Sequence, residues 1–191
     1  MKGYNKLRKK ALTLLQTKLS NKLYYHSIHH TLKALKTAEI YLKSLNIKGE
    51  EAKLLRIGIL LHDIGFTVST EDHEAHSVVI AKELMKACGF LDVHINIVKG
   101  LILATKIPQN PQTVLESIIC DVDLDYLGGP HFYKISHLLF KELKTLGRLK
   151  TEAQWHTIQI NFLKSHTYHT LHALKHREPQ KALRLAELLS K

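Results

Sequence analysis

The chain has 191 residues, 45% hydrophobic and 24% charged, a balance that excludes a disordered protein and predicts a single domain over residues 1–191. No apolar run approaches the roughly 18 residues that cross a bilayer, which excludes a membrane-spanning segment. The 28 basic and 17 acidic residues give a net charge of +11, which suits a phosphorylated small molecule and a nucleic acid equally well.

Apolar residues recur at every third or fourth position through the first half of the chain, a spacing that predicts amphipathic helices. The expected helices cover residues 4–19, 27–45, 50–63, 72–88 and 92–102. The first lies in a basic segment, residues 1–20, that lacks a small-residue cleavage site, so a cytoplasmic protein is expected. The helix over 50–63 is apolar on nearly every side, which predicts burial at the centre of the fold.

The second half continues the helical pattern after a loop at residues 106–112, which contains Pro108 and Pro111. Helices are expected over residues 114–122, 135–146 and 152–176, followed by a short one after Pro179. The helices of residues 152–191 should pack on the core, as should the N-terminal helix. No run of alternating apolar and polar residues indicates a strand. The sequence therefore predicts an all-α fold, a single helical bundle.

Two sets of residues that often bind metals have simpler explanations here. The histidines from His166 to His176 would share one face of the long helix over residues 152–176. No carboxylate belongs to this row, so a solvated or partner-facing surface is favoured over a metal site. The cysteines Cys88 and Cys120 lie in separate apolar patterns, so they are expected to be reduced core thiols.

The pair His62-Asp63 ends the most apolar of the expected helices. Burying an ionised carboxylate without a partner is costly, so Asp63 requires a cation, a donor network or a metal. His26 and His30 are four residues apart, which places both imidazoles on one helix face. Singly, these features could be an exposed helix end and a solvated helix start; together they favour a metal site.

Three aspartates, Asp121, Asp123 and Asp125, lie within five residues at the end of an otherwise apolar helix. Such crowded negative charges are unfavourable unless cations bind there or the helix end lies on a polar surface. A mixed set of imidazoles and carboxylates suits a divalent cation such as Mn, Fe, Ni, Co, Zn or Mg. The sequence leaves the identity of the cation open.

Several short motifs follow one another in a definite order along most of the chain. The motifs are Tyr25-His26-Ser27-x-x-His30-Thr31, Leu61-His62-Asp63-Ile64-Gly65-Phe66, His73-Glu74-x-x-Ser77, Thr105-Lys106-x-Pro108-Gln109, Asp121-x-Asp123-Leu124-Asp125-x-Leu127-Gly128, Tyr168-His169-Thr170 and Arg177-Glu178-Pro179. In these motifs the chain resembles the HD superfamily of metal-dependent phosphohydrolases, and more closely a family of small bacterial HD proteins. The resemblance implies an HD domain that hydrolyses a phosphate ester or diester with metal-activated water.

The resemblance also assigns roles to residues. It implies that His30, His62, Asp63 and Asp123 hold a divalent metal ion, with Asp121 as the alternative to Asp123. Asp63 could additionally orient or deprotonate the attacking water. The first motif is similar to that of cyclic-nucleotide phosphodiesterases, which makes His26 the expected general acid, although Ser27 stands where those families usually have Asn.

Three further residues are weaker candidates for binding the substrate. His73 stands where some two-metal HD proteins have a ligand, although one metal is the expected count. Lys106 and Arg177 could bind a substrate phosphate, and for each a solvated surface charge is the simpler explanation. The substrate is expected to be a phosphorylated small molecule, a nucleotide by preference.

Two other functions and the state of assembly stay open. One alternative is a non-catalytic HD protein that binds a nucleotide or RNA through its net charge of +11. Oxygenase-like chemistry at two irons would require more ligands than the sequence offers. The oligomeric state is open, with a dimer among the options.

Overall fold

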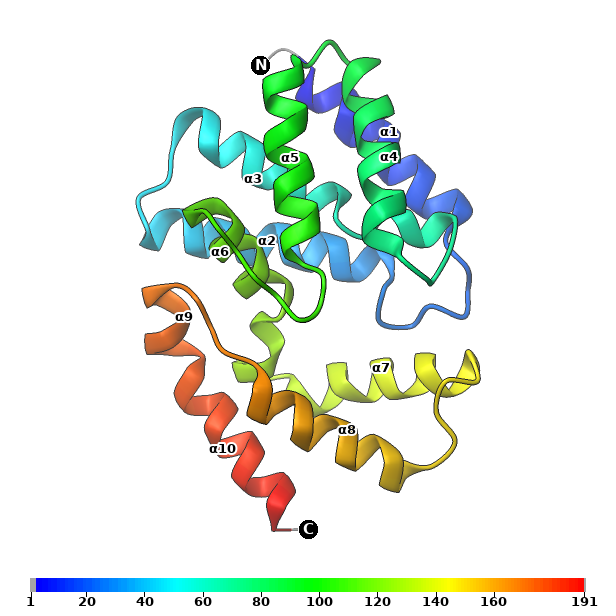
Figure 1. The fold of residues 1–191 in the computed structure, drawn as a ribbon, viewed down its shortest axis with the longest axis vertical. Helices are drawn as coiled ribbons and strands as arrows, with labels where there is room; N and C mark the ends of the chain where they lie inside the picture. The colour runs from blue at the N-terminus through cyan, green and yellow to red at the C-terminus, as the bar shows by residue number, and fades with distance from the viewer. Residues whose placement is uncertain (1–2, 191) are drawn as a thin grey trace. The chain divides into compact units, whose positions relative to one another are not determined.

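The computed structural model describes residues 3–190, which form ten α-helices and two short 3-10 helices without a strand (Figure 1). The predicted all-α fold class is therefore confirmed. The elements are α1 (Tyr4–Lys18), α2 (Ile28–Ser44), α3 (Gly49–Leu61), η1 (Ile64–Thr67), α4 (His73–Lys86), α5 (Asp92–Ala104), α6 (Val114–Asp123), η2 (Asp125–Gly128), α7 (Phe132–Thr145), α8 (Glu152–Ser165), α9 (Leu171–His176) and α10 (Glu178–Leu189). None of these helices is long and apolar enough to cross a membrane.

Contacts between residues divide the chain into two compact units. The N-terminal unit comprises the chain up to Ser20 together with His26–Asp123, and it contains α1 to α6. The C-terminal unit comprises Asn21–Tyr25 and the chain from Leu124 onward, and it contains η2 and α7 to α10. The single domain expected over residues 1–191 stays a prediction.

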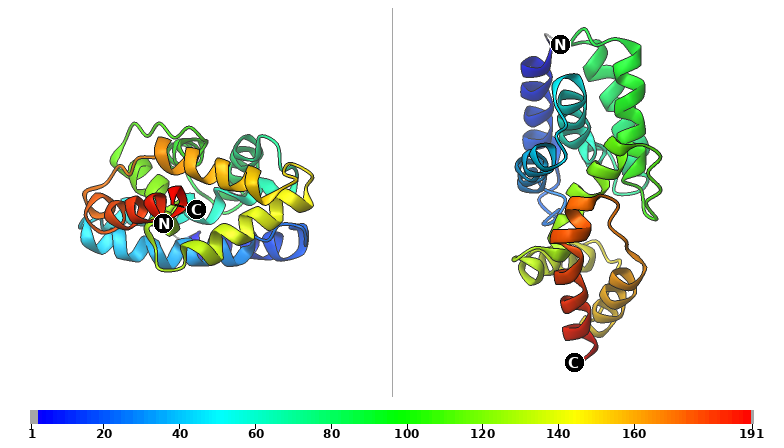
Figure 2. Two further views of the ribbon diagram at one scale, coloured as in Figure 1. Left: turned by 90° about the horizontal axis from the view of Figure 1, so that it is seen from below. Right: turned by 90° about the vertical axis from the view of Figure 1, so that its left-hand side faces the viewer.

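The N-terminal unit is built around α3, whose sequence is apolar on nearly all sides. Leu55, Ile57 and Leu60 are fully buried, and each such side chain contributes about 1.5–3 kcal/mol to folding. The helices α1, α2, α5 and α6 all pack against α3, as the views in Figures 1 and 2 show. The expected burial of this segment is confirmed, although the helix ends at Leu61 and residues 64–67 form the separate 3-10 helix η1.

In the C-terminal unit, α10 packs against η2, α8 and α9, and α7 packs against η2. The start of α8 is fixed by a capping box, in which the Thr151 side chain accepts the Gln154 N–H and the Gln154 side chain accepts the Thr151 N–H. This reciprocal pair satisfies two backbone donors that a helix start otherwise leaves open.

The loop expected at residues 106–112 and the helices around it are also present.

The helix expected over residues 152–176 is wrong, because the chain leaves α8 at His166 and enters α9 only after Thr170. His166 has extended backbone (φ −75°, ψ 134°), and the Thr170 hydroxyl accepts the Ala173 N–H at 3.2 Å as the cap of α9. Between them Tyr168 is buried, so tertiary contacts override the helical periodicity here. His166 and His169 consequently lie outside the helices, and only His172 and His176 share a face of α9, with ring centroids 4.8 Å apart.

Candidate metal centre

Four of the predicted site residues meet in the N-terminal unit, at the ends of three helices. His30 lies in the first turn of α2, His62 and Asp63 follow the last residue of α3, and Asp123 is the last residue of α6. These three helices pack against one another in every pairing. Residues that are distant in the sequence are thereby brought to one place.

Candidate ligand atoms of His30, His62 and Asp123 all lie within 4.8 Å of one another, and Asp63 approaches the two imidazoles. Nε2 of His30 lies 3.3 Å from Nε2 of His62, and Oδ1 of Asp123 lies 3.0 Å from the first nitrogen and 3.3 Å from the second. Oδ2 of Asp63 lies 3.4 Å from Nε2 of His30 and 3.2 Å from Nε2 of His62. Neighbouring ligands of a cation that binds at about 2.0–2.2 Å stand about 2.8–3.6 Å apart, so all five distances fit a shared ion.

Burial and charge both indicate that the cluster needs positive charge. Burial alone would raise the pKa of Asp63 and Asp123, but the imidazoles of His62 and His30 hold both pKa values below the ordinary range. Burial likewise acts to lower the pKa of His62, and the carboxylates of Asp63 and Asp123 outweigh it, so that the pKa lies well above its usual value. Two ionised carboxylates in a buried cluster are stable only beside a cation.

Asp63 provides a direct test of whether the residues fit a metal ion. Its Oδ2 atom is buried and has no hydrogen-bond partner among the described residues. A buried carboxylate oxygen left without a partner is unfavourable, and this atom faces the imidazole nitrogens of His30 and His62. A divalent cation shared by the cluster would satisfy it, so the donor set fits a metal ion.

The orientation of His62 is fixed from the side opposite the cluster. Its Nδ1 lies 2.8 Å from the backbone oxygen of Ile59, which can only accept a hydrogen bond. Nδ1 therefore carries the hydrogen in the neutral ring, and the lone pair of Nε2 points toward Asp63 and Asp123. This tautomer is the one that can bind a cation in the cluster.

The turn that carries Asp63 is held against α4. Ser77 of α4 is fully buried, and its hydroxyl accepts the Gly65 N–H at 2.8 Å. The two elements approach so closely that a Cβ atom on Gly65 would lie 1.9 Å from the backbone oxygen of His73. Only glycine fits at this position. The motifs around Gly65 and Ser77 thus have a physical reason, the close packing of this turn against α4.

His26, the predicted general acid, lies beside the cluster. Its ring centroid is 6.4 Å from that of His30, and its ring stacks on Phe66 with centroids 4.1 Å apart. Phe66 also stacks on His73 at 4.0 Å. Phe66, to which sequence reasoning assigned no role, therefore orients two imidazoles at the edge of the site.

His73, a weaker candidate for binding the substrate, also lies at the cluster. Its Nε2 is 3.6 Å from Oδ1 of Asp63, and its Nδ1 is 3.5 Å from Oε2 of Glu74. Burial lowers the pKa of His73 below its ordinary value, against the attraction of these two carboxylates. The two oxygens of Asp63 are thus divided between the imidazole pair of the cluster and His73.

Of the three crowded aspartates, only Asp123 reaches the cluster. Asp121 is fully buried two residues earlier on α6, and at about 100° per residue its side chain leaves the helix in a nearly opposite direction. Asp125 belongs to η2 in the other unit, where it accepts a hydrogen bond from Arg177. The structure therefore places Asp123, rather than Asp121, beside the two imidazoles.

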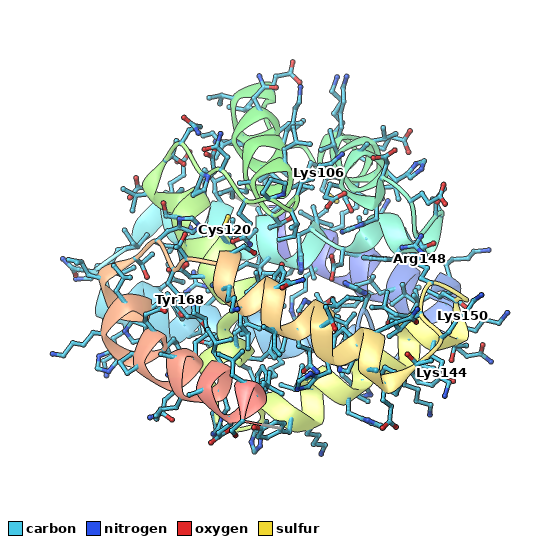
Figure 3. The ribbon with its side chains drawn as sticks, turned by 60° about the horizontal axis from the view of Figure 1, so that its bottom comes forward. Lys106, Cys120, Lys144, Arg148, Lys150 and Tyr168 are labelled. Carbon is cyan, nitrogen blue, oxygen red and sulfur yellow. The ribbon has the colours of Figure 1, made fainter. Side chains whose placement is uncertain are left out.

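Lys106 and Arg177 are not part of the cluster. Lys106 is exposed, and its Nζ lies 3.1 Å from Oδ1 of Asp72, the residue before α4 (Lys106 is labelled in Figure 3). Arg177 lies in the C-terminal unit, with its Nε 2.7 Å from Oδ1 of Asp125. Their role in binding a substrate stays a prediction.

A family model for the HD domain matches residues 27–125, just over half of the chain, and this range includes all four clustered residues. The chain therefore belongs to the HD-domain family, whose members have an all-α fold and are typically metal-dependent phosphohydrolases. Comparisons with curated proteins and with solved structures returned no match.

Proposed function

We propose that the protein hydrolyses a phosphate ester or diester of a small molecule, a nucleotide by preference, with a divalent cation held by His30, His62, Asp63 and Asp123. The observation that carries this proposal is the convergence of two imidazole nitrogens and two carboxylate oxygens, with five distances of 3.0–3.4 Å. Membership of the HD-domain family adds support for a hydrolase.

A bound cation would lower the pKa of water and offset the negative charge that develops on a phosphoryl oxygen. The side chains of the protein would bind the cation and orient the reacting groups. His62 presents Nε2 because Ile59 fixes its tautomer, and Asp63 presents one oxygen to the cluster. The second oxygen of Asp63 faces His73. This oxygen can accept a hydrogen bond and orient a water molecule.

His26 would protonate the leaving oxygen. Imidazole is the side chain best suited to donate a proton near neutral pH, and this ring lies next to the cluster without joining it. Stacking on Phe66 restricts its orientation, which suits a proton donor that must face the departing group.

The preference for a nucleotide rests on charge and resemblance. A net charge of +11 favours an anionic substrate, and a phosphorylated small molecule fits a site that can offset phosphoryl charge. Lys106, exposed and paired with Asp72 just before α4, is the predicted residue of the N-terminal unit for an additional phosphate contact. The ion pair between Lys106 and Asp72 would have to break before Lys106 could contact a substrate phosphate.

Metal analysis and a hydrolysis assay on one set of variants test the proposal. The purified protein is expected to bind about one divalent cation per chain and to hydrolyse at least one member of a panel of nucleotide esters and diesters. Asp63→Asn should lose both properties. Asp92→Asn, at an exposed position of the same unit, is the matched control and should keep both. Full activity in Asp63→Asn would refute the proposal, and RNA binding without turnover of any ester would favour the non-catalytic alternative.

A further inference from the structure

Two motifs near the C-terminus lie outside the HD match at residues 27–125 and have no part in the proposed chemistry. They contain Tyr168 and Arg177, and both side chains contact residues 124–128 within the C-terminal unit. This segment follows Asp123 directly, and Asp123 is the last residue of α6. A residue of the metal centre is thus one peptide bond away from a segment that the tail holds.

Tyr168 holds the segment through its hydroxyl group. The hydroxyl donates to the backbone oxygen of Leu124 at 3.2 Å and accepts the N–H of Gly128 at 3.0 Å. Tyr168 is only 3% exposed, so both hydrogen bonds are shielded from water (Tyr168 is labelled in Figure 3). One side chain therefore joins the beginning of the segment to its end.

Arg177 holds the middle of the segment. Its Nε donates to Oδ1 of Asp125 at 2.7 Å, and the two side chains are 20% and 13% exposed. The backbone oxygen of Arg177 also lies so close to Gly128 that a Cβ atom there would be 2.1 Å away. Glycine is required for this approach, which explains the end of the motif that begins at Asp121.

We propose that Tyr168 and Arg177 form a clasp on residues 124–128 that fixes the last turn of α6 and thereby the carboxylate of Asp123. The last turn of a helix lacks hydrogen bonds beyond it and opens easily unless other groups hold it. Tyr168 and Arg177 are positioning residues, because the proposal has them act on Asp123 through residues 124–128. The inference rests on the proposed function in one respect, the role of Asp123 as a metal ligand.

The clasp gives Arg177 a different role from binding a substrate phosphate. Its guanidinium is already paired with Asp125 in a largely buried position, and breaking a buried ion pair is costly. The clasp therefore predicts that Asp125 and Arg177 act as a unit, whereas a phosphate contact would involve Arg177 alone.

Hydrogen exchange in the metal-free full chain tests the clasp first. In Tyr168→Phe, peptides covering residues 119–129 should exchange at least about 10-fold faster than in the wild type, because both hydroxyl bonds are lost. The control is Tyr133→Phe, which removes a hydroxyl bonded to Glu187 in the same unit. Tyr133→Phe should leave the exchange rates of these peptides unchanged. Equal exchange of these peptides in Tyr168→Phe and the wild type would overturn the clasp.

Metal affinity and the visible spectrum of bound Co²⁺ give the second measurement. Tyr168→Phe should bind Co²⁺ about 10-fold more weakly and with an altered spectrum, as expected when a group that supports a ligand is removed. Tyr133→Phe should match the wild type in both. An unchanged affinity and spectrum in Tyr168→Phe would overturn the positioning of Asp123. A wild type that binds no metal would refute the proposed function, and hydrogen exchange would still decide on the clasp.

A double-mutant comparison separates the two roles of Arg177. If the clasp is correct, Arg177→Gln, Asp125→Asn and the double variant should weaken Co²⁺ binding to a similar extent, because each removes the same pair. If only Arg177→Gln has an effect, and that effect is a higher KM with unchanged Co²⁺ affinity, Arg177 binds substrate and its part in the clasp is overturned.

Discussion

Ser77 donates its hydroxyl hydrogen to the backbone oxygen of His62 at 2.6 Å, from a helix that contributes none of the four clustered residues. The same hydroxyl accepts the N–H of Gly65 at 2.8 Å, so one buried side chain spans the turn that carries Asp63. The turn that carries two of the proposed metal ligands therefore depends on α4 as well as on α3.

Replacing Ser77 by alanine should destabilise the protein and weaken metal binding. The change leaves the His62 oxygen and the Gly65 N–H without their partner, which costs about 1–3 kcal/mol. Because the ligand-bearing turn is then less restrained, metal affinity should fall about 10- to 100-fold. Urea unfolding and metal titration measure the two effects. Ser165→Ala, which removes an exposed hydroxyl bonded to Phe162, should change neither, and an unchanged metal affinity in Ser77→Ala would contradict the account.

Gly65→Ala should destabilise the fold far more than the same change at Gly89, where φ is positive but the space around the residue is open. The new Cβ would lie 1.9 Å from the backbone oxygen of His73, so α4 must move away, and we expect a loss of about 3 kcal/mol or more. Gly89 has φ +78° with open space around it, so Gly89→Ala should cost only about 1–2 kcal/mol. Free energies of unfolding from denaturant titration give the comparison. Equal losses at the two positions would be inconsistent with the close packing of η1 against α4.

Removing the metal should lower the melting temperature. A cation present at 100 times its dissociation constant stabilises the folded protein by about 2.7 kcal/mol, which corresponds to roughly 5–10 °C in a chain of this size. Calorimetry before and after chelation measures the difference. In Asp123→Asn the difference should nearly vanish, since that oxygen lies within 3.3 Å of both imidazole nitrogens. If Asp123→Asn kept the full difference in melting temperature between the metal-bound and metal-free forms, Asp123 would be excluded as a ligand.

His26→Ala should slow the reaction without removing the metal. Loss of a general acid lowers kcat about 10²- to 10⁴-fold for a substrate with a poor leaving group. An ester of p-nitrophenol needs little protonation, so its hydrolysis should slow much less. Metal content should equal that of the wild type, because the His26 ring lies beside the cluster and not in it. Equal slowing for both classes of substrate would rule out His26 as the proton donor.

Much of the N-terminal unit could be predicted from the sequence because its signals are local. Helical periodicity located α1 to α6 to within a few residues, and the four-residue spacing of His26 and His30 indicated one helix face. The pair His62-Asp63 stood out because it ended the most apolar helix. These inferences need only the chain's own pattern and a knowledge of helix geometry.

The remaining features depend on contacts between distant residues. Asp121 and Asp123 are chemically alike, and the choice between them depends on which face of α6 meets α2 and α3. The break at His166 follows from the burial of Tyr168, which overrides a periodic sequence. The role of Ser77 likewise appears only when α4 packs on the turn after α3. None of these has a local signal.

Anomalous diffraction from crystals grown with Mn²⁺ would show whether the four side chains share one cation. One strong peak is expected about 2.0–2.3 Å from Nε2 of His30 and His62, Oδ2 of Asp63 and Oδ1 of Asp123. A peak elsewhere in the chain, or no peak at this cluster at saturating Mn²⁺, would contradict this expectation.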